Sequence, residues 1–104
     1  MKTQTYSEFD LMDATLFSDG YAREPDMDDV FASWVKPREA YRLYIWYNRN
    51  TDRLDMRVVI PCGPDGLYGQ FTLFGLPRLD FLERLHAIER QACQTAGQLY
   101  YPMN

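Results

Sequence analysis

The sequence predicts an α+β fold, in which a three-stranded antiparallel meander packs against a C-terminal amphipathic helix, with two short N-terminal helices. Three observations lead to it. Apolar and polar residues alternate over 41–60, a Pro-Asp-Gly turn signal at 64–66 precedes a further alternating run, and apolar residues recur every three or four positions over 78–99. A chain of 104 residues suffices for one hydrophobic core. We expect a single domain over 1–104, made of an acidic helical segment (1–35), the meander (40–74) and the helix (78–99).

The two runs within 41–60 also predict a register. Apolar residues of the first run have odd numbers and those of the second have even numbers. A one-residue slip would send every side chain to the wrong face, so paired residue numbers must sum to an odd value. A turn of two or four residues meets this condition and pairs Ile45 with Met56 and Leu43 with Val58.

A third strand is predicted after the Pro-Asp-Gly turn, where proline presets φ and glycine tolerates a positive φ. Its apolar side is expected to be Leu67, Gly69, Phe71 and Leu73. The simplest continuation of the meander pairs Ile60 with Leu67, Met56 with Phe71, and Leu54 with Leu73.

The helices are predicted from apolar spacing and from their end signals. The C-terminal helix has Pro77 in its first turn and a stripe made of Phe81, Leu85, Ile88, Ala92, Ala96 and Leu99. A capping Ser7 opens a predicted helix over 7–17, and Asp26 caps a second one over 26–35, which Pro37 closes.

Charge is distributed unevenly along the chain. Residues 1–35 hold eight acidic and two basic residues, a net charge of −6, whereas 36–104 hold nine basic and seven acidic residues, which gives the total of −4. An acidic surface repels phosphates and attracts basic partners, so direct binding of nucleic acid is disfavoured.

Several classes of site lack a matching pattern. The acids Asp26, Asp28 and Asp29 do not have the spacing of a calcium-binding loop and are interpreted as helix-cap residues, so no metal and no cofactor are expected. Cys62 and Cys93 are interpreted as free thiols. A cytoplasmic location is expected, because we find no membrane span and no signal peptide.

One face of the predicted sheet is the candidate binding surface. It would gather Arg42, Tyr44, Trp46, Arg57 and Tyr68, with Asp26, Asp28 and Asp29 contributing from the acidic segment. Tyrosine, tryptophan and arginine are enriched at binding hot spots. Three alternatives stay open, namely burial of this face under the N-terminal helices, an ordinary solvated face, and self-association as a homodimer. Stacking of single-stranded bases ranks below these.

The function that these features favour is a small acidic, non-enzymatic protein-binding module whose partner has a basic surface, such as nucleic-acid-handling machinery. Small acidic inhibitors carried by phages and plasmids, including anti-CRISPR and antirestriction proteins, resemble it in size and charge pattern. One alternative is an immunity or adaptor subunit that binds one cognate protein by shape. Another is a small enzyme that uses Cys62 or His86.

Overall fold

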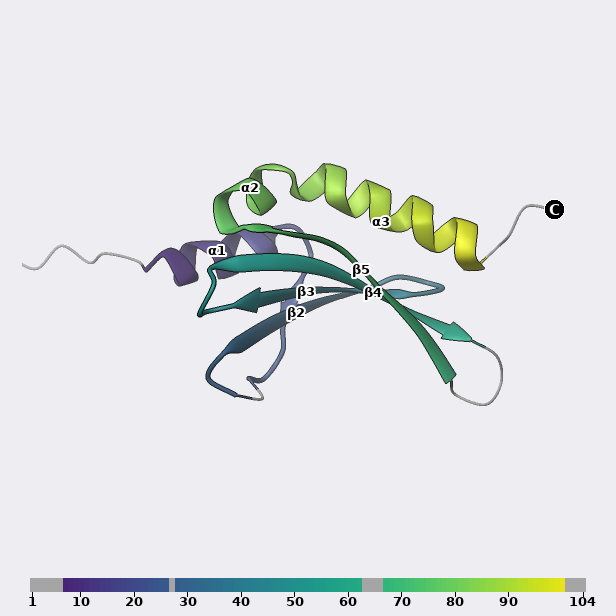
Figure 1. Cartoon of the computed structure of the whole chain (residues 1–104), viewed down its shortest axis with the longest axis horizontal. Helices are drawn as coiled ribbons and strands as arrows, with labels where there is room; N and C mark the ends of the chain where they lie inside the picture. The colour runs from purple at the N-terminus through teal and green to yellow at the C-terminus, as the bar shows by residue number, and fades with distance from the viewer. Residues whose placement is uncertain (1–6, 27, 63–66, 101–104) are drawn as a thin grey trace, which may run out of the picture.

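Five antiparallel strands and three helices form the part of the chain that the computed structural model describes, residues 7–26, 28–62 and 67–100. In chain order the elements are α1 (Glu8–Ser18), β1 (Ala22–Arg23), β2 (Phe31–Pro37), β3 (Arg42–Asn48), β4 (Arg53–Cys62), β5 (Leu67–Pro77), α2 (Arg78–Glu83) and α3 (Leu85–Tyr100) (Figure 1). Strands that are neighbours in sequence are also neighbours in the sheet. The α+β class and the antiparallel sheet are confirmed, but the sheet has five strands rather than three.

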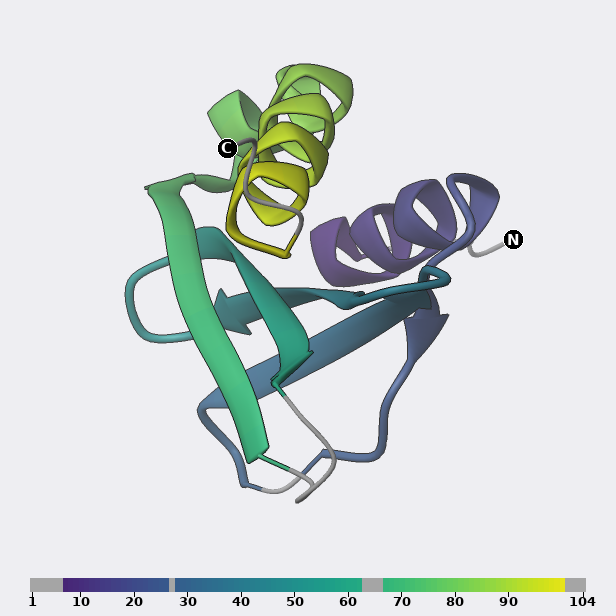
Figure 2. The ribbon, with the colours of Figure 1, turned by 90° about the vertical axis from the view of Figure 1, so that its right-hand side faces the viewer.

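The hydrophobic core lies between one face of the sheet and the helices. Figure 2 shows the helices on the same side of the sheet. The sheet contributes buried side chains from β2, β3 and β4, and the helices contribute buried side chains from α1, α2 and α3, including Leu43, Ile45, Met56, Val58, Met12, Leu16, Phe81, Leu85 and Ile88. None of the helices, as far as the described residues go, is long and apolar enough to cross a membrane.

The predicted register of the first hairpin is confirmed. β3 pairs with β4 so that Ile45 lies opposite Met56 and Leu43 opposite Val58. The turn has four residues between the last paired residues, Asn48 and Arg53, and the Asn48 side chain accepts a hydrogen bond from the Asn50 backbone N–H at 2.9 Å. Local side-chain bonds of this kind favour turns, which explains how the chain reverses here.

The predicted register of β4 with β5 is wrong by two residues. Met56 lies opposite Leu73 instead of Phe71, and Ile60 lies opposite Gly69 instead of Leu67. The reason is that β4 continues through Pro61 to Cys62, beyond Val59, the last residue of β4 that pairs with β3. A proline is tolerated there because β3 does not extend beside it, so no hydrogen bond between β3 and β4 is lost. A two-residue shift leaves every side chain on its predicted face.

A bulge breaks the β4 and β5 ladder near its other end. Leu54 pairs with Leu76 rather than with the predicted Leu73, and the extra residue lies in β5. Phe74, within the bulge, has φ = 54°. This is an uncommon backbone conformation for a bulky residue, and the alternation of apolar residues gave no sign of it.

The N-terminal third is half helical. α1 confirms the first predicted helix, with Ser7 as its cap. The second predicted helix, over 26–35, is wrong, because the segment forms β2 after a loop and β1 pairs with it. The aspartate signal was misread, since the Asp28 side chain accepts from the backbone N–H groups of Val30 and Phe31 and turns the chain into a strand.

The C-terminal helix is present in two parts. α2 and α3 meet at Arg84, which departs from helical geometry at φ = −102° and ψ = 12°. The predicted apolar stripe is buried at Phe81, Leu85, Ile88, Ala92 and Ala96, while the Leu99 side chain lies outside the described residues. Pro77 ends β5 and is the N-cap residue of α2 instead of lying in its first turn.

Candidate functional site

The face of the sheet opposite the helices, here called the outer face, is the candidate site. It consists of alternate residues from four strands, namely Phe31, Ser33, Val35, Arg42, Tyr44, Trp46, Asp55, Arg57, Val59, Gln70 and Thr72. The helices pack against the other face, so no helix of the described residues covers the outer face (Figure 2). The N-terminal helix therefore does not bury it: α1 contributes Met12 and Leu16 to the core.

Trp46 of β3 is an outer-face residue whose ring contacts two neighbouring side chains. The Arg57 guanidinium lies 4.0 Å from the centroid of the Trp46 ring, and the Phe31 ring lies 5.4 Å from it, centroid to centroid. Arg57 is oriented in turn by Asp55, whose carboxylate accepts from Arg57 Nε at 3.2 Å. Trp46 and Arg57 are half-buried, so the stack is ordered while part of it stays accessible.

An open depression adjoins this stack at the end of the outer face near the hairpin between β2 and β3. Its volume is about 570 Å³, and its lining includes Arg38, Tyr41, Arg42, Tyr44, Val59 and Pro61. Tyr44 and Arg42, two predicted site residues, line it directly. The Tyr68 backbone pairs with Pro61 beside it, but the Tyr68 side chain lies outside the described residues.

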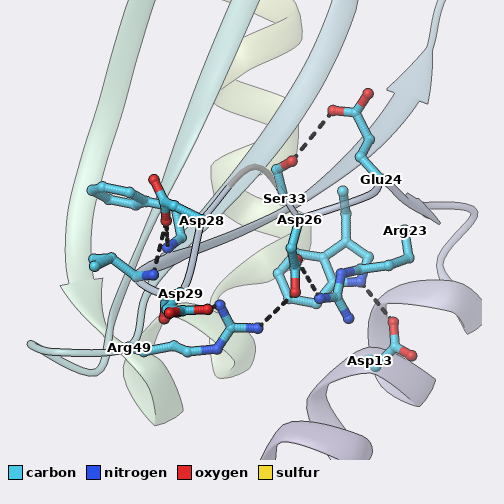
Figure 3. Close-up of polar contacts among 11 residues, drawn as sticks. Asp13, Arg23, Glu24, Asp26, Asp28, Asp29, Ser33 and Arg49 are labelled. Atoms are coloured by element: carbon cyan, nitrogen blue, oxygen red, sulfur yellow. Dashed lines mark hydrogen bonds and ion pairs between the residues drawn. The ribbon is translucent and has the colours of Figure 1, made fainter.

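The three aspartates predicted to bind a partner lie in the loop before β2, and the carboxylates of two of them accept hydrogen bonds from other residues of the chain (Figure 3). The Asp26 carboxylate accepts from Arg23 at 2.6 Å and from Arg49 at 3.1 Å. The hydrogen bond from Arg23 lowers the pKa of Asp26, and the hydrogen bonds from the backbone N–H groups of Phe31 and Val30 lower the pKa of Asp28. Asp29 is exposed, and its backbone carbonyl accepts from Arg49 at 3.4 Å.

Other acids of the first third also have intramolecular partners. Asp13 accepts a hydrogen bond from the indole N–H of Trp34 at 2.7 Å, and Glu24 accepts from Ser33 at 3.3 Å (Figure 3). Much of the acidic excess is therefore used to close loops and to position β2. The sequence shows the charge but not these pairings, because their partners lie up to tens of residues away.

His86 and Cys93 are the remaining titratable candidates whose side chains the structure describes. His86 is exposed on α3, with Nε2 3.1 Å from Asp19 Oδ1 at the end of α1. Cys93 is a half-buried free thiol, and the Cys62 side chain lies outside the described residues. Within the described residues, no group of three or more His, Cys, Asp or Glu side chains is placed to hold a metal ion.

The buried Glu89 carboxylate and its three hydrogen-bond donors, Tyr21, Lys36 and Arg38, are here called the Glu89 cluster. This cluster was not predicted from the sequence. Glu89 is 9% exposed and accepts hydrogen bonds from Tyr21 at 3.0 Å, Lys36 at 2.9 Å and Arg38 at 2.9 Å. The signal was available, because Glu89 lies one residue after Ile88 and four after Leu85, within the apolar stripe of α3. Both carboxylate oxygens accept hydrogen bonds, so the cluster fastens α3 to the start of the sheet.

Acid should weaken this cluster. Burial favours the neutral form of Glu89, but the hydrogen bonds from Lys36 and Tyr21 outweigh it and lower the pKa of Glu89. A lowered pKa in the folded state stabilises the protein above the ordinary value of 4.5, and this stabilisation is lost as the pH falls below it. We expect the free energy of unfolding, measured with urea from pH 7 to pH 3, to decline less steeply in Glu89→Gln than in the wild type. Parallel pH profiles would contradict this.

Comparison with known proteins identifies no relative of this chain. Neither a protein-family model, nor a curated protein, nor a solved structure matches the chain. Function is therefore proposed from the residues of the chain alone.

Proposed function

We propose that the chain is a small non-enzymatic protein-binding module that docks its partner on the outer face of the sheet. The observation that carries the proposal is the stack of Phe31, Trp46 and Arg57 on a face without a helix over it. Aromatic and arginine side chains that are already held in place lose little conformational entropy on binding, and such residues dominate interface energetics. The adjoining depression beside Tyr44 supports docking of a protruding side chain from the partner.

The class of partner is proposed from charge. Residues 1–35 carry a net charge of −6, which favours a protein with a basic surface. Proteins that handle nucleic acid have such surfaces, so an inhibitor of nucleic-acid-handling machinery is the role that we favour. Because Asp26 and Asp28 are already paired within the molecule, the aromatic stack supplies the affinity and the acidic excess chiefly speeds association.

The experiment compares capture of partners by matched variants. Tagged wild type, Trp46→Ala and Arg57→Ala would be used on a host lysate, with Phe17→Ala as control because Phe17 is an exposed aromatic residue of α1, away from the outer face. We expect Trp46→Ala and Arg57→Ala to lose a protein that the wild type and Phe17→Ala retain, and to weaken its measured affinity by about tenfold or more. Native circular dichroism must accompany the loss. Wild-type affinity in a folded Trp46→Ala would refute the proposal.

Salt separates charge-led from aromatic-led binding. Asp29→Lys is the suitable charge variant, because Asp29 is exposed whereas Asp28 caps the start of β2. If charge dominates, Asp29→Lys and raised ionic strength should both slow association with the captured partner. An association rate that is unchanged under both would instead identify a shape-led adaptor or immunity subunit.

A further inference from the structure

The two edges of the sheet differ in length and in charge. The edge at β1 is two residues long, and its Arg23 is followed directly by Glu24. The edge at β5 is eleven residues long, and β5 is the one strand of the five described that contains no charged residue. Natural sheets protect an exposed edge with short strands, charges or bulges. The bulge at Phe74 protects one end of β5, but the uncharged segment before it requires an explanation.

Among the described strands, none pairs with the backbone of β5 along one of its two sides. β5 is the last strand of the sheet and has β4 as its strand neighbour. The bulge at Phe74 interrupts the regular strand after Leu73, and pairing with β4 resumes at Leu76. Seven residues from Leu67 to Leu73 therefore present alternate N–H and C=O groups at the edge.

Apolar surface continues to this edge. Phe71 and Leu73 belong to the core face but are only half-buried, at the margin of the core. Phe74 and Leu79, at the junction of β5 with α2, are 44% and 65% exposed. A neighbour that extended both the sheet and the helix layer would cover these side chains.

We propose that a second copy of this chain is that neighbour, and that two copies pair antiparallel through β5 to form a continuous ten-stranded sheet. Symmetric antiparallel pairing places each residue of the strand opposite a residue of the same strand in the other copy, so a charge near the two-fold axis would lie close to the same charge of the other copy. β5 has none. With Phe71 on the two-fold axis, Gly69 faces Leu73; with Thr72 on it, Phe71 faces Leu73. Both registers put apolar residues opposite apolar or small ones on the core face.

A second copy fits this edge better than an isolated strand from another protein. A two-fold axis perpendicular to the sheet places α2 and α3 of both copies on the same side. The helix layer then continues over the half-buried Phe71 and Leu73 of each copy. An isolated strand would pair with the backbone but bring no such layer. The dimer also aligns two outer faces on the opposite side, which would give bivalent attachment to a repetitive or dimeric partner.

Analytical ultracentrifugation of the purified full chain tests the proposal without any partner. Thr72→Lys puts a cation at an exposed position in the middle of the edge, and Thr51→Lys makes the same substitution in the exposed turn between β3 and β4. We expect the wild type and Thr51→Lys to form dimers, and Thr72→Lys to dissociate at least about tenfold more readily. A monomeric wild type at the highest soluble concentration, or an unweakened dimer in folded Thr72→Lys, would overturn the proposal.

Hydrogen exchange gives a second measurement that does not depend on the folding of a variant. Amides of β5 residues 69–73 in the wild type should become more protected as protein concentration rises. Protection that is independent of concentration would overturn the proposal, and protection that appears only when a captured partner is added would assign the edge to that partner's strand. Trp46→Ala lies on the outer face and should dimerise normally, so failure of the dimer and failure of the binding-face proposal are distinguishable.

Discussion

Replacing Glu89 with alanine is expected to lower the free energy of unfolding by about 2–3 kcal/mol at neutral pH. The substitution leaves Lys36, Arg38 and the buried Tyr21 hydroxyl without their common acceptor. Removing one member of a buried charge pair costs more than this in general, but Lys36 and Arg38 keep some access to water and recover part of their hydration.

Urea unfolding followed by circular dichroism measures this effect. Glu83→Ala is the matched control, because Glu83 is an exposed glutamate at the end of α2. We expect Glu83→Ala to stay within about 0.5 kcal/mol of the wild type. If Glu89→Ala and Glu83→Ala were equally stable, the Glu89 cluster would have no role in fastening α3 to the sheet.

Trp34→Ala is expected to cost about 3–5 kcal/mol, which is a large share of the roughly 5–15 kcal/mol that stabilises a domain of this size. The Trp34 ring is fully buried, packs 5.8 Å from Phe9 by ring centroids, and donates its indole N–H to Asp13. The Arg23 guanidinium lies 5.2 Å from the ring centroid. The substitution therefore opens a cavity and removes the partner of a carboxylate in one step.

The chain has two tryptophans, so the buried Trp34 and the half-buried Trp46 can be compared within the same protein. Trp46→Ala removes the half-buried tryptophan of the outer face and should keep native circular dichroism with a loss of no more than about 1–2 kcal/mol. Acrylamide should quench the fluorescence of Trp46 in Trp34→Phe more strongly than that of Trp34 in Trp46→Phe. The reverse order of quenching would show that the two faces of the sheet have been assigned wrongly.

The meander could be predicted from sequence because its information is local. Apolar residues have odd numbers in one run and even numbers in the next, so the numbers of paired residues must sum to an odd value. The pairs of Ile45 with Met56 and of Leu43 with Val58 follow from this condition and the short turn. The side of each residue in β5 was predicted correctly even though its partner was not, since a two-residue shift preserves the face. The placement of Asp55 and Arg57 on the same face as Trp46 could be predicted for the same reason, whereas the contact of Phe31 with Trp46 could not, because 26–35 was expected to be helical.

The first third could not be predicted to the same extent, because its structure depends on distant residues. An aspartate before an apolar segment marks a helix start or a turn into a strand with nearly the same local pattern. In β2 the choice is made by pairing with β3, where Trp34 meets Ile45 on the core face. The hydrogen-bond partners of Asp26 and Glu89 could not be predicted for a related reason, because pairings between side chains that are distant in sequence leave no periodic pattern in it.

The segregation of all three helices to one face has a consequence for how this protein can change over generations. Side chains on the outer face, among them Tyr44, Trp46 and Arg57, are separated from the core by the backbone of the sheet itself. Substitutions there should have little effect on folding, so a library randomised at these three positions should yield mostly folded chains, and under the proposed function its members would differ in the partner that they bind. A protein under selection to bind a changing partner could therefore acquire substitutions on this surface while its fold is kept.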